Sequence, residues 1–298
     1  MSSPRPERDR PARGDHRHRD HRDGDRDHRD RDGDRDHRDR DERDRRRREL
    51  SQNYLRSPEA AARFLREVDS DPGGLCLEVG AGEGILTRRL ATMFGEVTAY
   101  EIDPAGASRL SAATSGLANV RVVMGDFLAA HPPRQPFQVA GNAPFSLTSP
   151  IVDWCLHART MTSATLITQL EYARKRTGGY GRWSLLTVST WPQVRWELRA
   201  TIGREQFRPV PRVDAGILRI DRRPQPLIPA ARMATYQRLV RAGFSGVGGS
   251  LLASLRREYP PERLRAAFQA AGVDRAAVVA FVSPAQWVEL FRILDRGN

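Results

Sequence analysis

The sequence predicts an α/β fold, a mainly parallel β-sheet covered by helices, with a small all-helical domain after it and a disordered tail before it. Three observations support this prediction. Short apolar runs alternate with helix-like segments through the middle of the chain, as in sheets buried on both faces. The last seventy or so residues show helical periodicity throughout, and the first 48 contain almost no apolar side chain.

The segment 1–48 holds 18 arginines, 15 acidic residues and five of the seven histidines. A nine-residue unit, DGDRDHRDR, fills 23–31 and repeats unchanged at 32–40. Because such a segment cannot bury enough apolar surface to offset its ordering entropy, we expect a disordered mixed-charge tail. It either makes first contact with RNA, keeps the protein soluble, or has no specific role.

Charge and composition narrow the class of protein. The whole chain has a formal net charge of +12, of which the 250 residues after the tail carry +9, so we expect a polyanionic partner. The absence of an apolar run of 18 residues and of a signal or transit peptide predicts a cytoplasmic protein with no membrane partner. Cys76 and Cys155, far apart in apolar surroundings, are expected to fill the core rather than form a disulfide or zinc site.

After the tail, the predicted elements follow in order. A helix is expected over about 58–69, because Ser57 is a good N-cap and Pro58 suits the first turn, and it should stop at the Asp71–Gly74 turn. Strands are predicted at 75–79, 97–102, 120–124, 137–140 and 164–168, with helices between them at 86–94, 105–114 and 150–157. Extended runs at 185–198 and 213–220 are separated by a loop and suit an antiparallel pair at one sheet edge.

The C-terminal part is predicted to be helical at 231–242, 248–258, 261–271 and 284–294. A glycine cluster at 246–249 and the Pro260–Pro261 pair separate these helices, and an Arg- and Pro-rich linker precedes them at 221–229. The predicted organisation is therefore a tail at 1–48, a catalytic domain at 49–222 and a helical RNA-binding domain at 223–298.

A glycine-rich segment follows the first predicted strand and opens a helix. Its residues Glu78, Gly80, Gly82 and Gly84 let the backbone approach a ligand beside the free N–H groups of a helix start. The spacing Gly-x-Gly-x-Gly departs from the dinucleotide pattern, and the acid would repel a pyrophosphate but suit a cationic ligand. A tight strand-to-helix turn without a ligand would also account for it.

Acidic residues follow the next two strands, in Glu101-Ile102-Asp103 and Gly125-Asp126-Phe127. Glu101 stands where an acid accepts hydrogen bonds from ribose hydroxyls, and Asp126 could accept one from an adenine amine. Either acid alone could be a helix cap or a solvated loop residue. Acids after three successive parallel strands indicate a ligand site, because ligands bind outside the carboxyl ends of such strands.

The segment Asn142-Ala143-Pro144-Phe145 follows the fourth strand. An aromatic amine is a poor nucleophile because its lone pair is delocalised. The Asn142 oxygen and a backbone carbonyl can accept its two N–H bonds and localise that lone pair toward a methyl donor. Phe145 can stack on the base, and Pro144 stiffens the loop. A plain proline turn is the alternative.

A basic stretch with aromatic residues precedes the predicted edge strand. It comprises Arg174, Lys175, Arg176, Tyr180, Arg182 and Trp183, and Arg204, Arg208 and Arg212 could extend it. Cations interleaved with aromatics suit a phosphate backbone and splayed bases. The alternative is an ordinary solvated face with Trp183 in the core.

These motifs together resemble the Erm 23S rRNA methyltransferases, within the rRNA adenine N6-dimethyltransferase superfamily. The matching segments are 51–55 (SQNYL), 78–84, 101–103, 125–127, 142–145, 169–184 (QLEYARKRTGGYGRWS) and 207–214 (FRPVPRVD). The resemblance covers essentially all of 49–298. Two departures are Ala143, where relatives often carry Leu or Ile, and Tyr54, where Phe is usual.

The resemblance implies a Rossmann-like sheet, S-adenosylmethionine (SAM) as methyl donor, and N6 of one adenine in the peptidyl-transferase loop of 23S rRNA as acceptor. Such methylation gives resistance to macrolides, lincosamides and streptogramin B, and the enzyme is expected to be a monomer that needs no metal. The implied SAM-binding residues are Gln52, Asn53, Leu55, Glu78, Gly80, Gly82, Gly84, Glu101, Ile102, Asp126, Phe127 and Asn142. The implied catalytic residues are Asn142, Ala143, Pro144 and Phe145, and the implied RNA-binding residues are Arg174, Lys175, Arg176, Arg182, Arg208 and Arg212.

Two alternatives remain open at this point. A housekeeping 16S rRNA adenine dimethyltransferase shares the donor-site motifs, although the 169–184 segment and the charged tail favour the resistance branch. A non-catalytic nucleic-acid-binding factor on the same fold would have no need of the donor loop or of Asn142–Phe145. The sequence does not distinguish mono- from dimethylation, and it does not define the drug profile, the minimal RNA, the expression control or the role of the tail.

Overall fold

The structure is a computed structural model that describes residues 53–246 and 248–295. The tail predicted at 1–48 and Gln52, which was expected to bind SAM, lie outside the described residues. The strands are β1 (Tyr54–Leu55), β2 (Asp71–Val79), β3 (Phe94–Glu101), β4 (Val120–Met124), β5 (Phe137–Asn142), β6 (Met161–Gln169), β7 (Val194–Ile202), β8 (Phe207–Arg208) and β9 (Ala215–Arg222). The α-helices are α2 (Pro58–Leu65), α3 (Thr87–Leu90), α4 (Pro104–Thr114), α5 (Thr148–His157), α6 (Leu170–Thr177), α7 (Leu185–Thr190), α8 (Met233–Gly243), α9 (Leu251–Leu255), α10 (Pro261–Ala270) and α11 (Pro284–Asp295), with short 3₁₀ turns η1 to η5 between them.

The main sheet has seven strands in the order β4-β3-β2-β5-β6-β9-β7. The five strands from β4 to β6 are parallel, and β9 runs antiparallel to both β6 and β7. The chain order reverses between β2 and β5, and this is where ligands bind in open α/β sheets. A separate two-stranded pair, β1 with β8, sets Tyr54 opposite Arg208.

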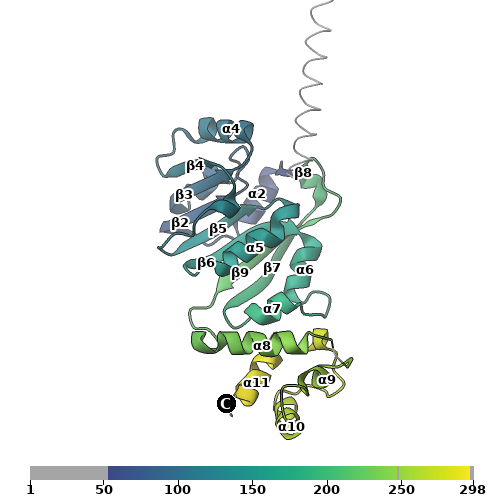
Figure 1. Cartoon of the computed structure of the whole chain (residues 1–298). Helices are drawn as coiled ribbons and strands as arrows, with labels where there is room; N and C mark the ends of the chain where they lie inside the picture. The colour runs from purple at the N-terminus through teal and green to yellow at the C-terminus, as the bar shows by residue number, and fades with distance from the viewer. Residues whose placement is uncertain (1–52, 247, 296–298) are drawn as a thin grey trace, which may run out of the picture. The chain divides into compact units, whose positions relative to one another are not determined.

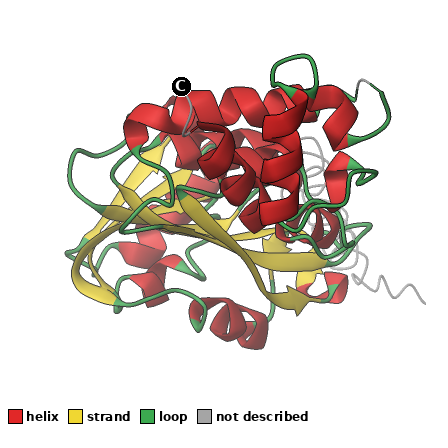
Figure 2. Cartoon of the chain, turned by 90° about the horizontal axis from the view of Figure 1, so that it is seen from below, coloured by secondary structure: helices red, strands yellow, loops and turns green. Residues whose placement is uncertain are grey.

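Helices cover both faces of the sheet, as Figures 1 and 2 show. Alternate residues of the strands divide between the two apolar cores, because successive side chains of a strand point to opposite faces. On one face Leu77 and Val139 pack with Ile151 of α5. On the other face Cys76 and Val97 share a core with residues of α2 and α3. The continuous apolar runs of the strands are the consequence of this two-sided burial.

The helices α8 to α11 form a further apolar core around Trp287 and Tyr236. Val188 of α7 belongs to this core, although it precedes the domain boundary expected after residue 222. The Tyr236 hydroxyl donates to the Val188 carbonyl at 2.8 Å, and the buried hydroxyl thereby gains a partner. The helical core is therefore continuous with α7 (Figure 1).

The expected strands and most of the expected helices are confirmed, with shifted ends. One prediction is wrong: residues 185–190 form α7 rather than part of an extended run. Ser184 caps this helix by accepting the Thr187 N–H at 3.2 Å, and its Val188 side chain is buried. Tertiary packing and the cap thus override the β propensity of Thr187, Val188 and Thr190. The antiparallel edge pair is confirmed as β7 with β9.

Smaller corrections concern ends of elements. The first helix ends at Leu65 rather than about 69, and the expected turn at 71–74 is the start of β2. The helix expected at 86–94 is only α3, and the one expected at 248–258 is only α9. Cys76 and Cys155 are both buried free thiols, as predicted. Among the described residues, none of the helices has the length and apolarity that a membrane span requires.

Candidate active site

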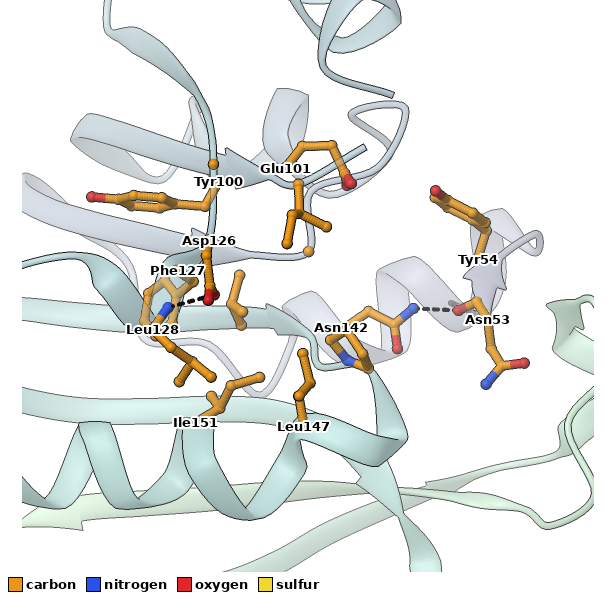
Figure 3. Close-up of a pocket in the computed structure, with 15 residues that line it drawn as sticks. Asn53, Tyr54, Tyr100, Glu101, Asp126, Phe127, Leu128, Asn142, Leu147 and Ile151 are labelled. Atoms are coloured by element: carbon orange, nitrogen blue, oxygen red, sulfur yellow. Dashed lines mark hydrogen bonds between the residues drawn. The ribbon is translucent and has the colours of Figure 1, made fainter. Parts of the chain in front are cut away.

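A cavity of about 580 Å³ lies at the carboxyl end of the parallel strands, where four of them end side by side. Its polar lining comes from residues at the ends of β2, β3, β4 and β5 and from the N-terminal segment at Asn53 and Tyr54 (Figure 3). The lining residues are Asn53, Tyr54, Val79, Gly80, Tyr100, Glu101, Ile102, Gly125, Asp126, Phe127, Leu128, Asn142, Pro144, Leu147 and Ile151.

The glycine-rich turn after β2 lets two backbone segments meet. Gly80 has a φ of +66°, and a Cβ atom there would lie 2.8 Å from the carbonyl oxygen of Asn142. Gly82 has a φ of +59°, and a Cβ atom there would lie 2.6 Å from the Tyr54 ring. Glycine is required at both positions because a side chain would be strained by the left-handed backbone and blocked by these neighbours.

Glu101 is buried at the end of β3 and is held by two backbone donors. The Gly82 N–H donates to its Oε2 at 2.7 Å, and the Asp103 N–H donates to its Oε1 at 2.9 Å. Asp103 in turn caps α4 by accepting the Gly106 N–H at 2.9 Å. The carboxylate is therefore fixed at the cavity edge by the glycine turn on one side and the start of α4 on the other.

Asp126 is exposed and lines the cavity at the end of β4, opposite Leu147 and Ile151 (Figure 3). Its Oδ1 accepts the Leu128 N–H at 2.9 Å and so caps a 3₁₀ turn. The apolar side of the cavity is built from Leu128, Leu147 and Ile151. A planar ring between this apolar side and Asp126 would find both apolar contact and a hydrogen-bond acceptor at its edge.

Asn142 ends β5 and is oriented by the N-terminal segment. Its Nδ2 donates to the carbonyl oxygen of Asn53 at 2.5 Å (Figure 3). With the amide nitrogen engaged in this way, the side chain presents its oxygen as an acceptor. The adjoining Ala143 is buried, and Pro144 lines the cavity.

Phe145 stands beside Phe207 of β8, with ring centroids 6.5 Å apart in an edge-to-face arrangement. Phe207 is fully buried, whereas Phe145 is half-buried. Because β8 pairs with β1 and sets Leu55 opposite Phe207, the same packing connects the Phe145 turn to β1. Two segments about sixty residues apart in the chain are thus held together by one aromatic contact.

Glu78 is buried directly before the glycine turn and does not line the cavity. Within the described residues, no hydrogen bond of normal geometry reaches either of its oxygens. Burial raises the pKa of Glu78 to about 8, the nearby Thr87 hydroxyl opposes this, and the negative charge of Glu101 adds to it. A buried carboxyl with no partner is suited to a cationic group close by.

A second hollow of about 990 Å³ adjoins the first and shares Tyr54, Gly80 and Asn142 with it. Three cations, Arg56, Arg88 and Arg208, are among its other lining residues. Glu83 also lines it and forms an ion pair with Arg109 at 3.2 Å. A positively charged approach therefore leads to the Asn142 side of the cavity.

The other predicted cations lie along α6 and on the loops beside it. Arg174 and Lys175 are exposed in the last turn of α6, whereas Arg176 donates to Ser184 Oγ at 3.0 Å and lies over the Tyr172 ring. Arg182 lies over the ring of Phe281. Arg212 is exposed after β8, and its carbonyl accepts from Arg204.

The structure brings eight of the predicted site residues around the first cavity, namely Asn53, Gly80, Glu101, Ile102, Asp126, Phe127, Asn142 and Pro144. Leu55 lines the second hollow, while Glu78, Gly82, Gly84, Ala143 and Phe145 line neither. The prediction missed Tyr54, Tyr100, Leu147 and Ile151 of the first cavity and Arg56 and Arg88 of the second. Tyr100 directly precedes Glu101 and could have been found from that position. No cluster of three or more His, Cys, Asp or Glu residues suited to a metal ion occurs within 53–246 or 248–295.

Comparison with known proteins finds a matching family, similar sequences and a similar structure. A family model described as ribosomal RNA adenine dimethylase matches residues 43–296. The chain is 58% identical over 252 residues to the rRNA adenine N-6-methyltransferase of Streptomyces fradiae, covering 84% of this chain and 79% of that protein. It is 36% identical over 247 residues to the mycinamicin-resistance protein MyrB of Micromonospora griseorubida, covering 83% and 78%. The crystal structure of the 23S rRNA methyltransferase ErmE matches with a TM-score of 0.79 and 50% identity, over 82% of this chain and all of that one.

Proposed function

The chain belongs to the ribosomal RNA adenine dimethylase family, and from this membership we propose that it methylates N6 of one adenine in the peptidyl-transferase loop of 23S rRNA, with SAM as donor. The proposed consequence is resistance to macrolides, lincosamides and streptogramin B. The observation that carries the proposal is the convergence of Gly80, Glu101, Asp126 and Asn142 from four strand ends on one cavity.

The residues of the cavity fit the donor. Tyr100, Leu147 and Ile151 offer apolar contact to an adenine ring, with Asp126 at its edge as an acceptor for the exocyclic amine. The fixed Glu101 carboxylate suits two ribose hydroxyls. The glycine turn admits the methionine part. Its cationic amine would favour the charged form of the Glu78 carboxyl, whose pKa burial raises to about 8 in the ligand-free chain. When bound, SAM supplies a methyl group on a positively charged sulfur.

The acceptor would reach the cavity from the side of Asn142. The bond from Asn142 Nδ2 to Asn53 leaves the amide oxygen to accept an N–H of the adenine amine, which localises the nitrogen lone pair. Phe145, backed by the buried Phe207, would stack on the flipped base. Moving the adenine out of its base stack costs a few kcal/mol, and this cost is smallest for an unpaired base, so an unpaired target is favoured. The protein thereby contributes position and electrostatics rather than covalent chemistry.

Exposed cations would hold the RNA around this site. Arg56, Arg88 and Arg208 surround the adjoining hollow, and Arg174, Lys175, Arg182 and Arg212 extend the positive surface. Each phosphate contact by such a cation makes binding more dependent on salt. We assign SAM binding and catalysis to 49–222 and further RNA contacts to 223–298, in a protein that acts as a monomer.

Primer extension on 23S rRNA tests the proposal. The full chain and its Asn142→Ala variant are expressed in a susceptible bacterium, and the purified proteins are tested for SAM binding by calorimetry. We expect the native chain to produce one new stop at a peptidyl-transferase-loop adenine together with macrolide resistance. The variant should lose transfer by at least about 100-fold, the scale of removing one polar group from a preorganised site, while its affinity for SAM falls far less.

Other outcomes point elsewhere. Methylation near the 3′ end of 16S rRNA, with none on 23S rRNA, would assign the chain to the housekeeping reaction. A folded chain that neither binds SAM nor methylates either RNA would favour a non-catalytic nucleic-acid-binding role. Equal turnover by Asn142→Ala and the native chain would refute the role assigned to Asn142.

A further inference from the structure

Exposed apolar side chains are concentrated in two short segments that do not line the cavity. Seven large apolar residues are exposed in the described part of the chain, and four of them come from two short segments. Tyr180 and Leu185 belong to the segment after α6, and Val278 and Phe281 to the turn before α11. The Trp183 N–H donates to the Ala280 carbonyl at 2.7 Å and so joins the two segments.

The aromatic residues of these segments are divided between the core and the solvent. Trp183 turns inward and packs edge-to-face on Trp191, with ring centroids 5.8 Å apart, against the helical core. In contrast, Tyr180 and Phe281 are 52% and 54% exposed. Trp183 therefore adds to the helical core, whereas the Tyr180 and Phe281 rings are left largely exposed and add little to it.

A cation lies over one of the exposed rings. The Arg182 guanidinium carbon is 5.4 Å from the centroid of the Phe281 ring, a cation–π contact between the two joined segments. Such a pair offers one flat aromatic ring together with a positive charge. We refer to Tyr180, Arg182 and Phe281 as the Arg182–Phe281 surface.

The surroundings of this surface are positive. The last turn of α6 carries the exposed Arg174 and Lys175, and the loop folds back so that the Gly179 N–H donates to the Arg174 carbonyl at 2.9 Å. Gly178, with a φ of +74°, ends the helix and directs the chain toward Arg182. Exposed aromatic rings beside cations fit an unpaired nucleotide, whose base stacks while its phosphate meets the charge.

We propose that the Arg182–Phe281 surface binds one unpaired base of the acceptor RNA, stacked on Phe281, in addition to the adenine that enters the cavity. This inference rests on the proposed function. Because α6 has eight residues and each adds 1.5 Å, about 12 Å of helix separates Leu170, which follows the end of β6, from the loop that leads to Arg182. A second base held there would fix the RNA relative to the site and so select a folded loop.

The test measures binding of the full chain to an rRNA fragment that contains the target loop, by fluorescence anisotropy at constant salt. We expect Phe281→Ala to weaken binding about 5- to 150-fold, the range given by stacking of one base. Phe281→Trp should retain it. Val278→Ala is the matched control, because it removes an exposed apolar side chain of the same turn without removing a ring. Binding of a fully paired duplex should be equal for all three variants.

A fluorescent adenine analogue placed at each unpaired position identifies the stacked base. One position other than the target should be quenched by the native chain and not by Phe281→Ala. If the native chain methylates the RNA and Phe281→Ala binds it equally well, the stacking site is refuted while the proposed function stands. If Phe281→Ala instead changes the sedimentation coefficient, the surface is an interface between copies. A native chain that neither binds nor methylates the RNA refutes both proposals.

Discussion

Replacing Gly80 with alanine tests whether the close approach of two strand ends builds the site. The φ of +66° alone makes a side chain unfavourable by about 1–2 kcal/mol. The added Cβ atom would also lie 2.8 Å from the carbonyl oxygen of Asn142, whereas a carbon–oxygen contact is normally about 3.3–3.6 Å. The end of β5 must therefore move by roughly 0.5 Å or more, and this displaces Asn142 from Asn53.

The expected result is a loss of both stability and transfer. Unfolding in urea should show Gly80→Ala to be less stable by roughly 2–3 kcal/mol. This sum combines the cost of a side chain at positive φ with part of the cost of the close contact to the Asn142 carbonyl. Methyl transfer should fall by about 100-fold, since small misplacements of a positioning group have effects of that size. SAM binding should weaken as well, because Gly80 lines the cavity.

Two other glycines separate the contributions. Gly272 has a φ of +59° with no atom close to an added Cβ, so Gly272→Ala should show the backbone cost alone. Gly116 has neither a positive φ nor a close neighbour, so Gly116→Ala should be neutral. The reasoning is refuted if Gly80→Ala is no less stable than Gly272→Ala and transfers methyl groups at the native rate.

Two further predictions concern buried side chains of the site. Because burial holds the pKa of Glu78 near 8 in the folded chain, against 4.5 when exposed, the folded state keeps a proton that the unfolded state loses between these pH values. The free energy of unfolding of the ligand-free chain should therefore fall by roughly 4–5 kcal/mol from this group between pH 4.5 and 8. Glu78→Gln should remove that fall, so the variant should be more stable than the native chain at pH 8 but not at pH 5. If urea unfolding shows the same difference in stability between variant and native chain at both pH values, the assignment is contradicted. Phe207→Ala should cost about 3–5 kcal/mol by urea unfolding and also slow transfer, because Phe207 is fully buried and backs Phe145; full activity in a destabilised variant would show that this backing is dispensable.

The local sequence was sufficient for the parallel part of the sheet. A strand buried on both faces is a short apolar run whatever its neighbours, and the last five residues of β2, Leu75–Val79, are all buried and coincide with the predicted run. The local sequence was not sufficient for residues 185–190, which were predicted to be extended. The observed helix depends on the packing of Val188 near Tyr236, nearly fifty residues away in the chain. Propensity is a weak term that such long-range packing readily overrides.

The candidate site divides in the same way. Residues carried by strand-end motifs, such as Glu101 and Asn142, could be placed because parallel strands end at a common edge. The apolar side of the cavity could not be predicted, since Leu147 and Ile151 are four residues apart on a helical face, a spacing typical of any core-facing helix. Phe281 carries no motif, and its significance comes from its exposure and from Arg182 above it.

The sequence by itself therefore determined the class of fold, the family and the chemical groups at the strand ends, because these follow from periodicity and from short motifs. Tertiary structure alone decided that Asn53 orients Asn142, that Phe207 supports Phe145, and that two distant segments place Arg182 over Phe281. Each of these is a contact between residues far apart in the chain. Such contacts depend on how the strands and helices pack, which local sequence patterns do not specify.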